Sequence, residues 1–219
     1  MSRNRNIYIT AVILVMLVAG VMGLAIYQQW RVSQGELGME EPPDVSEYNA
    51  YIYDEPRDIR DFSLTDEQGD SVDSSMFEGQ WTIAFVGFTY CPDICPATMA
   101  MLSQAAKQIP NEVPEPQVLL VSADPERDTP EQLNQYVTFF GDGFRGVTGD
   151  YEGLERLARD LNAVFMHNDD ADGQKAVDHS SHLALISPHG QLVGIIQPPH
   201  NAEAVVNVYE AVHDWIPAR

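Results

Sequence analysis

The two cysteines of this 219-residue chain, Cys91 and Cys95, lie four positions apart in the segment CPDICP. The residues just before them, 81–90, are uncharged and rich in β-branched and aromatic side chains, which predicts a buried strand. Beyond them apolar residues recur at helical spacing: Met99, Leu102, Ala106 and Ile109. The cysteines therefore lie between a strand and the first turn of a helix, where free backbone N–H groups and the helix dipole favour the thiolate. This position indicates a chemical site.

Three kinds of site can use such a pair of thiols. A structural disulfide closing so short a loop would contribute only about 2 kcal/mol, so it is the least favoured. A redox dithiol usually has two residues between its cysteines, whereas three intervene here. Thiolates one helical turn apart can still close a disulfide, and they can also share one soft metal ion. Two sulfurs select copper(I) or zinc, and one nitrogen ligand would complete a trigonal site. A peroxidase is a weaker alternative, because the reactive thiol alone supports it.

Six histidines are candidates for the nitrogen ligand: His167, His179, His182, His189, His200 and His213. His179 differs from the others because it lies just before the apolar run 183–186, which predicts a strand. His182 is its rival, and in an extended chain it points to the opposite face. The pattern alone leaves the choice between them open.

The rest of the chain predicts an α/β domain. A short hairpin is expected over 62–72, and runs of strand length occupy 117–123, 144–148, 164–167, 182–187 and 191–197. Helices are expected after the caps Thr129, Asp150 and Asn201. This order is typical of a mixed central sheet covered by helices, with the cysteine loop at the carboxyl end of a central strand. Ligand sites of open α/β sheets lie at that edge.

Three separated motifs resemble those of one known family. They are CPDICP at 91–96, DPERDTP at 124–130, and VDHSS followed by LALISPHG between 177 and 190. In this order they are similar to the Sco/SenC family over roughly residues 60–217. The resemblance implies a thioredoxin-like α/β fold with a mixed central sheet. It also implies a membrane-anchored copper protein that assembles the copper A centre of cytochrome c oxidase.

The same resemblance assigns the candidate ligands. Cys91 and Cys95 correspond to the two thiolate ligands of the family, and His179 to its copper-binding histidine. Copper would be held as Cu(I), with Cu(II) as a second state. Asp178 would orient the loop or the imidazole. His182 lies outside the family pattern and is interpreted as a bystander.

The resemblance implies a metallochaperone that passes copper from a periplasmic donor to subunit II of the oxidase, and so an assembly factor rather than an enzyme. The alternative is a thiol–disulfide oxidoreductase that keeps the copper-ligand cysteines of that subunit reduced, with Cys91 attacking and Cys95 resolving. Thioredoxins keep a cis-proline where this chain has Asp178 and His179. That difference favours metal binding.

The amino-terminal region predicts a membrane anchor. Residues 7–27 are uncharged and almost wholly apolar, and about 32 Å of helix would match the hydrocarbon core of a bilayer. Arg3 and Arg5 precede the run, which places the amino terminus in the cytoplasm and the rest in the periplasm of a bacterial inner membrane. The expected organisation is a cytoplasmic end (1–6), the anchor (7–27), a tether (28–59) and the copper-binding domain (60–219).

The composition is strongly acidic, with 33 acidic against 12 basic side chains and a net charge of −21. So acidic a surface argues against nucleic acid as a partner. The acids are spread along the chain, which favours general solvation, as in a salt-rich habitat. Residues 168–173 resemble the opening of an EF-hand loop, but its twelfth position is His179 instead of glutamate. An acidic loop that aids ion capture is the better interpretation.

Overall fold

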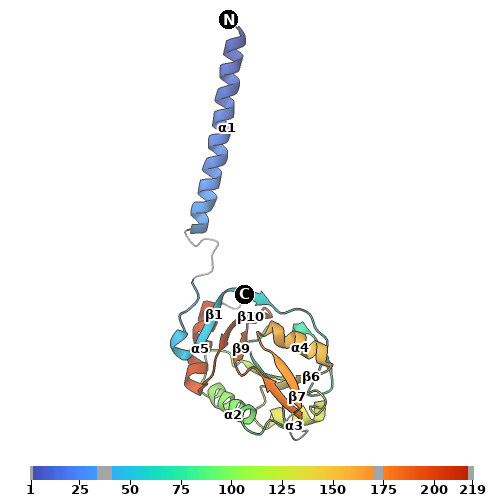
Figure 1. The fold of residues 1–219 in the computed structure, drawn as a ribbon. Coiled ribbons are helices and arrows are strands. Elements are labelled where there is room, and N and C mark those ends of the chain that lie inside the picture. Colours follow the sequence, from blue (N-terminus) through green and yellow to red (C-terminus); the bar gives the residue numbers. More distant parts are fainter. Residues whose placement is uncertain (1, 34–40, 170–174, 217–219) are drawn as a thin grey trace. The chain divides into compact units, whose positions relative to one another are not determined.

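The computed structural model describes residues 2–33, 41–169 and 175–216 (Figure 1). The chain divides into two compact units, Met1–Glu41 and Pro42–Arg219. In the first unit, helix α1 (Ser2–Ser33) includes the predicted anchor. A search of the described residues finds no helix with the length and apolar character that crossing a bilayer requires. Most of the EF-hand-like loop, residues 170–173, lies outside the described residues.

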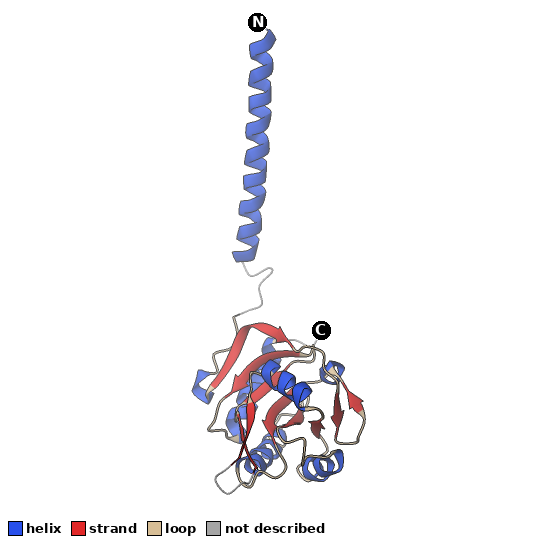
Figure 2. Cartoon of the chain, turned by 45° about the vertical axis from the view of Figure 1, so that its right-hand side comes forward, coloured by secondary structure: helices blue, strands red, loops and turns tan. Residues whose placement is uncertain are grey.

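The second unit is built on an eight-stranded mixed sheet in the order β1-β10-β9-β4-β5-β6-β2-β3. Figure 2 shows the strands of this unit in red and its helices in blue. Strands β4, β5 and β6 are parallel, and the other pairings are antiparallel. The predicted mixed sheet is confirmed, and the strand that leads to the cysteines is interior. The strands are β1 (Ala50–Asp58), β2 (Leu64–Asp66), β3 (Ser71–Val72), β4 (Thr82–Gly87), β5 (Gln117–Ser122), β6 (Phe144–Thr148), β9 (Leu183–Ile186) and β10 (Gln191–Ile196).

The described part of this unit also contains four α-helices: α2 (Ile94–Ala106), α3 (Pro130–Thr138), α4 (Tyr151–Asp160) and α5 (Ala202–Trp215). The predicted caps are confirmed, because the side chains of Thr129, Asp150 and Asn201 each accept a backbone N–H of the helix that follows. Helix α2 packs against α5, and Ser103 of α2 donates to the carbonyl of Phe140 just after α3. Two short 3₁₀ helices are also present: η1 (Ser46–Tyr48) precedes β1, and η2 (Ser74–Phe77) lies between β3 and β4.

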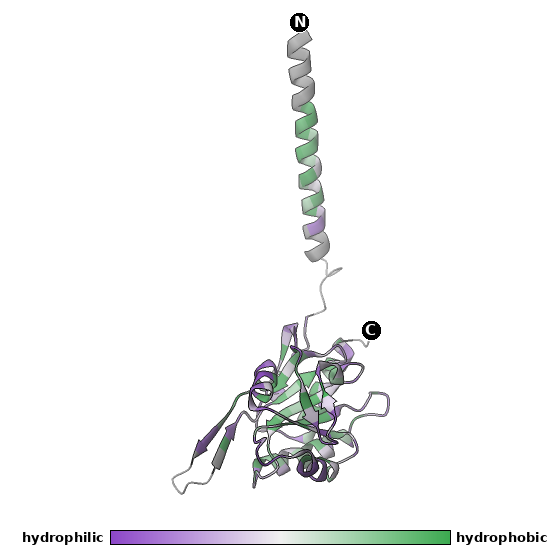
Figure 3. Cartoon of the chain, turned by 90° about the vertical axis from the view of Figure 1, so that its right-hand side faces the viewer, coloured by the Kyte–Doolittle hydropathy of each residue, from purple (hydrophilic) through white to green (hydrophobic). Residues whose placement is uncertain are grey.

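The core lies on both sides of the central strands. Every residue of β4, β5 and β9 is buried, and Figure 3 shows these central strands as the most hydrophobic part of the domain. Each fully buried aliphatic side chain contributes about 1.5–3 kcal/mol. This packing fixes the carboxyl end of β4, from which the cysteine loop leaves.

Strand β1 corrects the predicted domain boundary. The sequence predicts a tether over 28–59, but residues 50–58 form an edge strand in which Ala50 pairs with Ile196 and Asp58 with Gln191. The register shifts between Ile52 and Arg57, across two acids and a proline. This irregularity removes the simple alternation that predicts a strand. The folded domain therefore begins before residue 60.

The segment around His179 also differs from expectation. Strands β7 (Phe165–Asp169) and β8 (Lys175–His179) pair as a separate antiparallel ribbon, with Phe165 opposite His179. Figure 3 shows this ribbon reaching out from the body of the domain. The sequence predicts a short extended piece over 164–167, followed by an acidic turn. It does not predict β8, because this strand is short and has a polar residue at each end. His179 thus ends a strand instead of lying in a loop.

Candidate metal centre

Both cysteines lie where the sequence places them. Cys95 is in the first turn of α2, and Cys91 is in the loop before it, where its N–H donates to the carbonyl of Phe88 at 3.3 Å. The N–H of Cys95 donates to Sγ of Cys91 at 3.4 Å, so this sulfur receives a free N–H of the helix terminus. Both side chains are buried, with exposures of 8% for Cys91 and 0% for Cys95.

His179 presents one defined nitrogen to the cysteines. Its Nδ1 lies 2.9 Å from the carbonyl oxygen of Ser180. Because a carbonyl only accepts, Nδ1 carries the hydrogen and the lone pair of the neutral ring is on Nε2. Nε2 lies 3.6 Å from Sγ of Cys95, and the ring of Phe88 meets the imidazole edge to face at 5.8 Å. The imidazole is therefore held in the tautomer that a metal ligand needs.

The three side chains converge on one point. Among the described residues they are the one group of three potential metal ligands found, with ligand atoms all within 4.8 Å of one another. The cysteines are free thiols. Two sulfurs and one imidazole nitrogen form a donor set that suits a soft ion such as copper(I).

The sequence predicts that the helix terminus favours the thiolate of Cys95, and the structure differs on this point. Burial raises the pKa of this thiol far above its usual range; a backbone hydrogen bond at Phe88 lowers it in part, and the side chain of Cys91 and the charge of Asp128 raise it further. The helix terminus therefore does not by itself hold Cys95 as a thiolate. A metal ion must displace its proton to bind.

Gly87 is a site residue that sequence reasoning missed. A Cβ built on it would lie 2.9 Å from Sγ of Cys95 and 2.7 Å from the ring of Phe85. The sulfur occupies the space that any larger residue would fill. The available signal was a glycine at the end of an otherwise bulky strand, which often marks a close approach.

The family resemblance implies that Asp178 orients the loop or the imidazole, but the imidazole of His179 is oriented by the backbone of Ser180. The Ser180 N–H donates to the carbonyl of Val164 at 2.9 Å, and its Oγ accepts the N–H of Val164 at 3.0 Å. The carboxylate of Asp178 accepts instead from the amide of Asn168. His182 lies outside the group of three, with Nε2 donating to the carbonyl of Leu161 at 3.0 Å.

The other four histidines occupy separate places. His167 and His200 donate to the carbonyls of Ala123 and Ile196, at 2.7 Å and 3.1 Å. His189 is at a hairpin tip, and His213 packs against the rings of Trp81 and Tyr209. None of them belongs to the group that the described residues form around Cys95.

Comparison with known proteins agrees with the motifs. Residues 53–214 match the family model described as SCO1/SenC. The chain belongs to the SCO1/SenC family. Its α/β fold with a mixed central sheet is the thioredoxin-like fold that this family's structures have.

Individual relatives extend this result. A Stutzerimonas stutzeri protein, whose name describes it as copper-binding, is 35% identical over 81% of this chain and 88% of its own length. The mitochondrial SCO1 homolog 1 of Arabidopsis thaliana is 34% identical over 67% of this chain, which covers 44% of that relative. The crystal structure of Arabidopsis thaliana ScoI with copper bound has a TM-score of 0.66 and 32% identity, over 71% of this chain and 98% of that one.

Proposed function

We propose that this SCO1/SenC protein is a copper metallochaperone whose ligands are Cys91, Cys95 and His179. The observation that supports this most is the convergence of two thiols and one imidazole lone pair within 4.8 Å. Copper is the cargo, bound as Cu(I) and also as Cu(II). Trigonal coordination by two sulfurs and one nitrogen suits the first state. The related ScoI structure with copper bound supports the same choice of metal.

The recipient we propose is the copper A site of cytochrome c oxidase subunit II, with a periplasmic protein as donor. Transfer by ligand exchange needs close approach, because both sulfurs are almost completely buried. Tyr90 precedes Cys91 and Ile94 precedes Cys95, and these two side chains belong to residues that are 54% and 50% exposed. These side chains offer a partner an apolar contact beside the ligands.

We further propose that residues 7–27 anchor the chain in the bacterial inner membrane, with the copper domain in the periplasm. The uncharged apolar run and the two arginines before it support this arrangement. A protease-accessibility assay on spheroplasts would test it. Degradation of the domain only after the inner membrane is broken would contradict the orientation.

A second candidate function is reduction of the disulfide between the recipient's ligand cysteines. The N–H that Cys95 donates to the Cys91 sulfur favours it, because this hydrogen bond holds the attacking sulfur beside the resolving cysteine. Cys91 would attack the partner disulfide and release one partner thiol. Cys95 would then displace the second, so that the partner is reduced as Cys91 and Cys95 form a disulfide.

The test is a copper(I) titration of the reduced full-length chain against a competing chelator. His179→Ala is compared with His182→Ala, which removes an imidazole three residues away that bonds to Leu161. We expect one tight equivalent in the wild type, retained in His182→Ala and weakened at least about tenfold in His179→Ala, Cys91→Ser and Cys95→Ser. If the protein is instead a disulfide reductase, its reductase activity should survive His179→Ala and be lost only in the cysteine variants.

Weak copper binding by the wild type, or equal affinity in His179→Ala, would overturn the chaperone proposal. Each variant would then be assayed for reduction of an oxidised copper A domain. Activity that survives His179→Ala but not Cys91→Ser would establish the second candidate.

A further inference from the structure

Asp128 is a completely buried carboxylate that neither proposed function uses. Its exposure is 0%, and it lies two residues before α3, in the segment 124–130. Its Oδ1 accepts the N–H of Thr89 at 3.1 Å and the hydroxyl of Thr89 at 2.7 Å. Its Oδ2 accepts the hydroxyl of Ser122 at 2.6 Å. One side chain thus accepts from three donors: the N–H and the hydroxyl of Thr89, which follows β4, and the hydroxyl of Ser122 in β5.

These bonds join the carboxyl ends of the two central parallel strands. Ser122 is the last residue of β5, and Thr89 lies two positions beyond the end of β4. Thr89 is also inside the turn in which the N–H of Cys91 donates to the carbonyl of Phe88. Asp128 itself is held by its own N–H, which donates to the carbonyl of Asp124 at 2.9 Å. A connected path therefore runs from the start of α3 to the turn that presents Cys91.

We propose that Asp128 is the positioning residue of the cysteine loop: its carboxylate holds Thr89 and so sets the placement of the Cys91 sulfur relative to that of Cys95. This inference rests on the proposed use of the two thiols, whether for copper or for disulfide exchange. Asp128 is not itself one of the proposed ligands or thiols, and it sets this placement through its hydrogen bonds to Thr89.

The chemistry of the three donors explains why a carboxylate is needed. An ionised carboxyl group accepts at both oxygens, whereas an amide accepts at only one. Asp128→Asn can keep the shape of the side chain but must turn an N–H₂ group toward either Thr89 or Ser122. Hydrogen bonds to charged groups are stronger than those between neutral groups. The substitution therefore weakens the hold on Thr89 and the cysteine loop without creating a cavity at position 128.

The experiment measures the thiol–disulfide equilibrium of the full-length chain with glutathione. The protein dithiol and one glutathione disulfide exchange to give the Cys91–Cys95 disulfide and two glutathione thiols. The variants are Asp128→Asn, Thr89→Val and the double substitution. Glu67→Gln is the matched control, because Glu67 is also a buried carboxylate with several donors, and β5 and β6 separate its neighbour β2 from β4.

We expect Asp128→Asn and Thr89→Val each to lower the equilibrium constant at least about tenfold, since a looser loop lowers the effective concentration of one thiol near the other. The double variant should fall no further than the lower single variant, because both remove the same contact. Glu67→Gln should destabilise the fold against urea yet leave the equilibrium constant within about twofold.

An unchanged constant in Asp128→Asn, or an equal shift in Glu67→Gln, would overturn the proposal. If Asp128→Asn does not fold, Thr89→Val decides, because it removes only one of the three bonds. The readout needs no copper. A wild type that binds copper weakly would therefore count against the chaperone proposal and leave the test of Asp128 intact.

Discussion

The sulfur of Cys95 is confined by the backbone of β4, and Gly87 is the residue that makes room for it. A methyl group at this position would meet Sγ at 2.9 Å and the ring of Phe85 at 2.7 Å. We expect Gly87→Ala to displace the sulfur, to weaken copper(I) binding about tenfold or more, and to cost about 1–3 kcal/mol of stability. Copper titration and urea unfolding measure the two effects.

Gly143→Ala is the control for this substitution, because its nearest neighbouring atom would lie 3.9 Å from the new Cβ. It should leave copper affinity unchanged. Normal copper binding in Gly87→Ala would mean that the sulfur has more freedom than the packing around it implies.

The buried thiol of Cys95 predicts a pH dependence of copper binding. Burial holds its pKa well above neutrality, so the group is protonated before the metal arrives and must release that proton to become a ligand. Apparent affinity should therefore rise with pH, by about tenfold per unit for each proton displaced, between pH 6 and 8. Titrations across this range, with proton release followed in weakly buffered solution, check the sign. An affinity independent of pH would mean that the thiol is already ionised.

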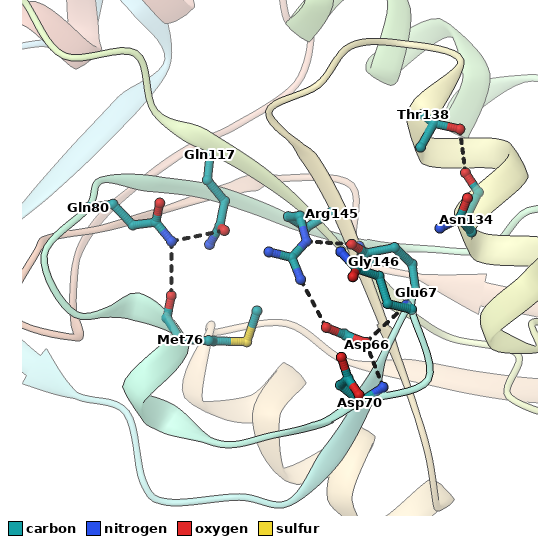
Figure 4. A network of polar contacts seen from close by, with 11 residues as sticks. Asp66, Glu67, Asp70, Met76, Gln80, Gln117, Asn134, Thr138, Arg145 and Gly146 are labelled. Carbon is teal, nitrogen blue, oxygen red and sulfur yellow. Dashed lines mark hydrogen bonds and ion pairs between the residues drawn. The ribbon is translucent and has the colours of Figure 1, made fainter.

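At the scale of elements, one arginine ties the small β2–β3 hairpin to the sheet (Figure 4). Arg145 of β6 donates to both Asp66 and Glu67, whose side chains are 6% and 4% exposed. Glu67 also accepts the N–H of Gly146, and Asp66 accepts the N–H groups of Gln68 and Asp70 in the hairpin turn. Arg145→Met should cost about 2–3 kcal/mol, because two buried carboxylates lose their cation while its own site is partly solvated.

Urea unfolding measures this loss, and Arg156→Met is the control. Arg156 pairs with Glu152 on the exposed surface of α4 at 3.4 Å, so its removal should cost less than about 0.5 kcal/mol. Equal destabilisation by the two substitutions would show that the buried carboxylates do not depend on Arg145.

The elements also show how far the sequence could predict this molecule. The strand–loop–helix unit, the caps and the positions of the central strands along the chain follow from local patterns, because apolar periodicity and capping side chains act over a few residues. Strand β1 could not be predicted, because its irregular register with β10 hides the alternation. The support of His179 by Ser180 and Val164, and of Thr89 by Asp128, depends on contacts between segments distant in sequence. Spacing alone does not encode those contacts.

At the scale of the whole molecule, the net charge of −21 is the dominant electrostatic feature. The residues beyond 27 include all 33 acidic side chains but only ten of the 12 basic ones. The ion pairs described above neutralise only a few of these acids. The remaining carboxylates repel one another more strongly in the compact folded state than in the expanded unfolded chain, and this repulsion destabilises the fold. This repulsion is long-ranged in dilute buffer, where the screening length is about 30 Å at 0.01 M ionic strength, and short-ranged near 1 M, where it is about 3 Å.

Salt should therefore stabilise the fold. We expect the thermal midpoint to rise between about 0.01 M and 1 M sodium chloride, by about 2–4 °C for each kcal/mol gained in a chain of this size. Tetramethylammonium chloride at equal ionic strength separates screening from binding of a specific cation, because screening depends on ionic strength and not on the identity of the ion. An equal rise in both salts supports screening as the cause, and a rise in sodium chloride alone indicates cation sites among the acids. An unchanged midpoint in both would exclude adaptation of this acidic surface to a salt-rich habitat.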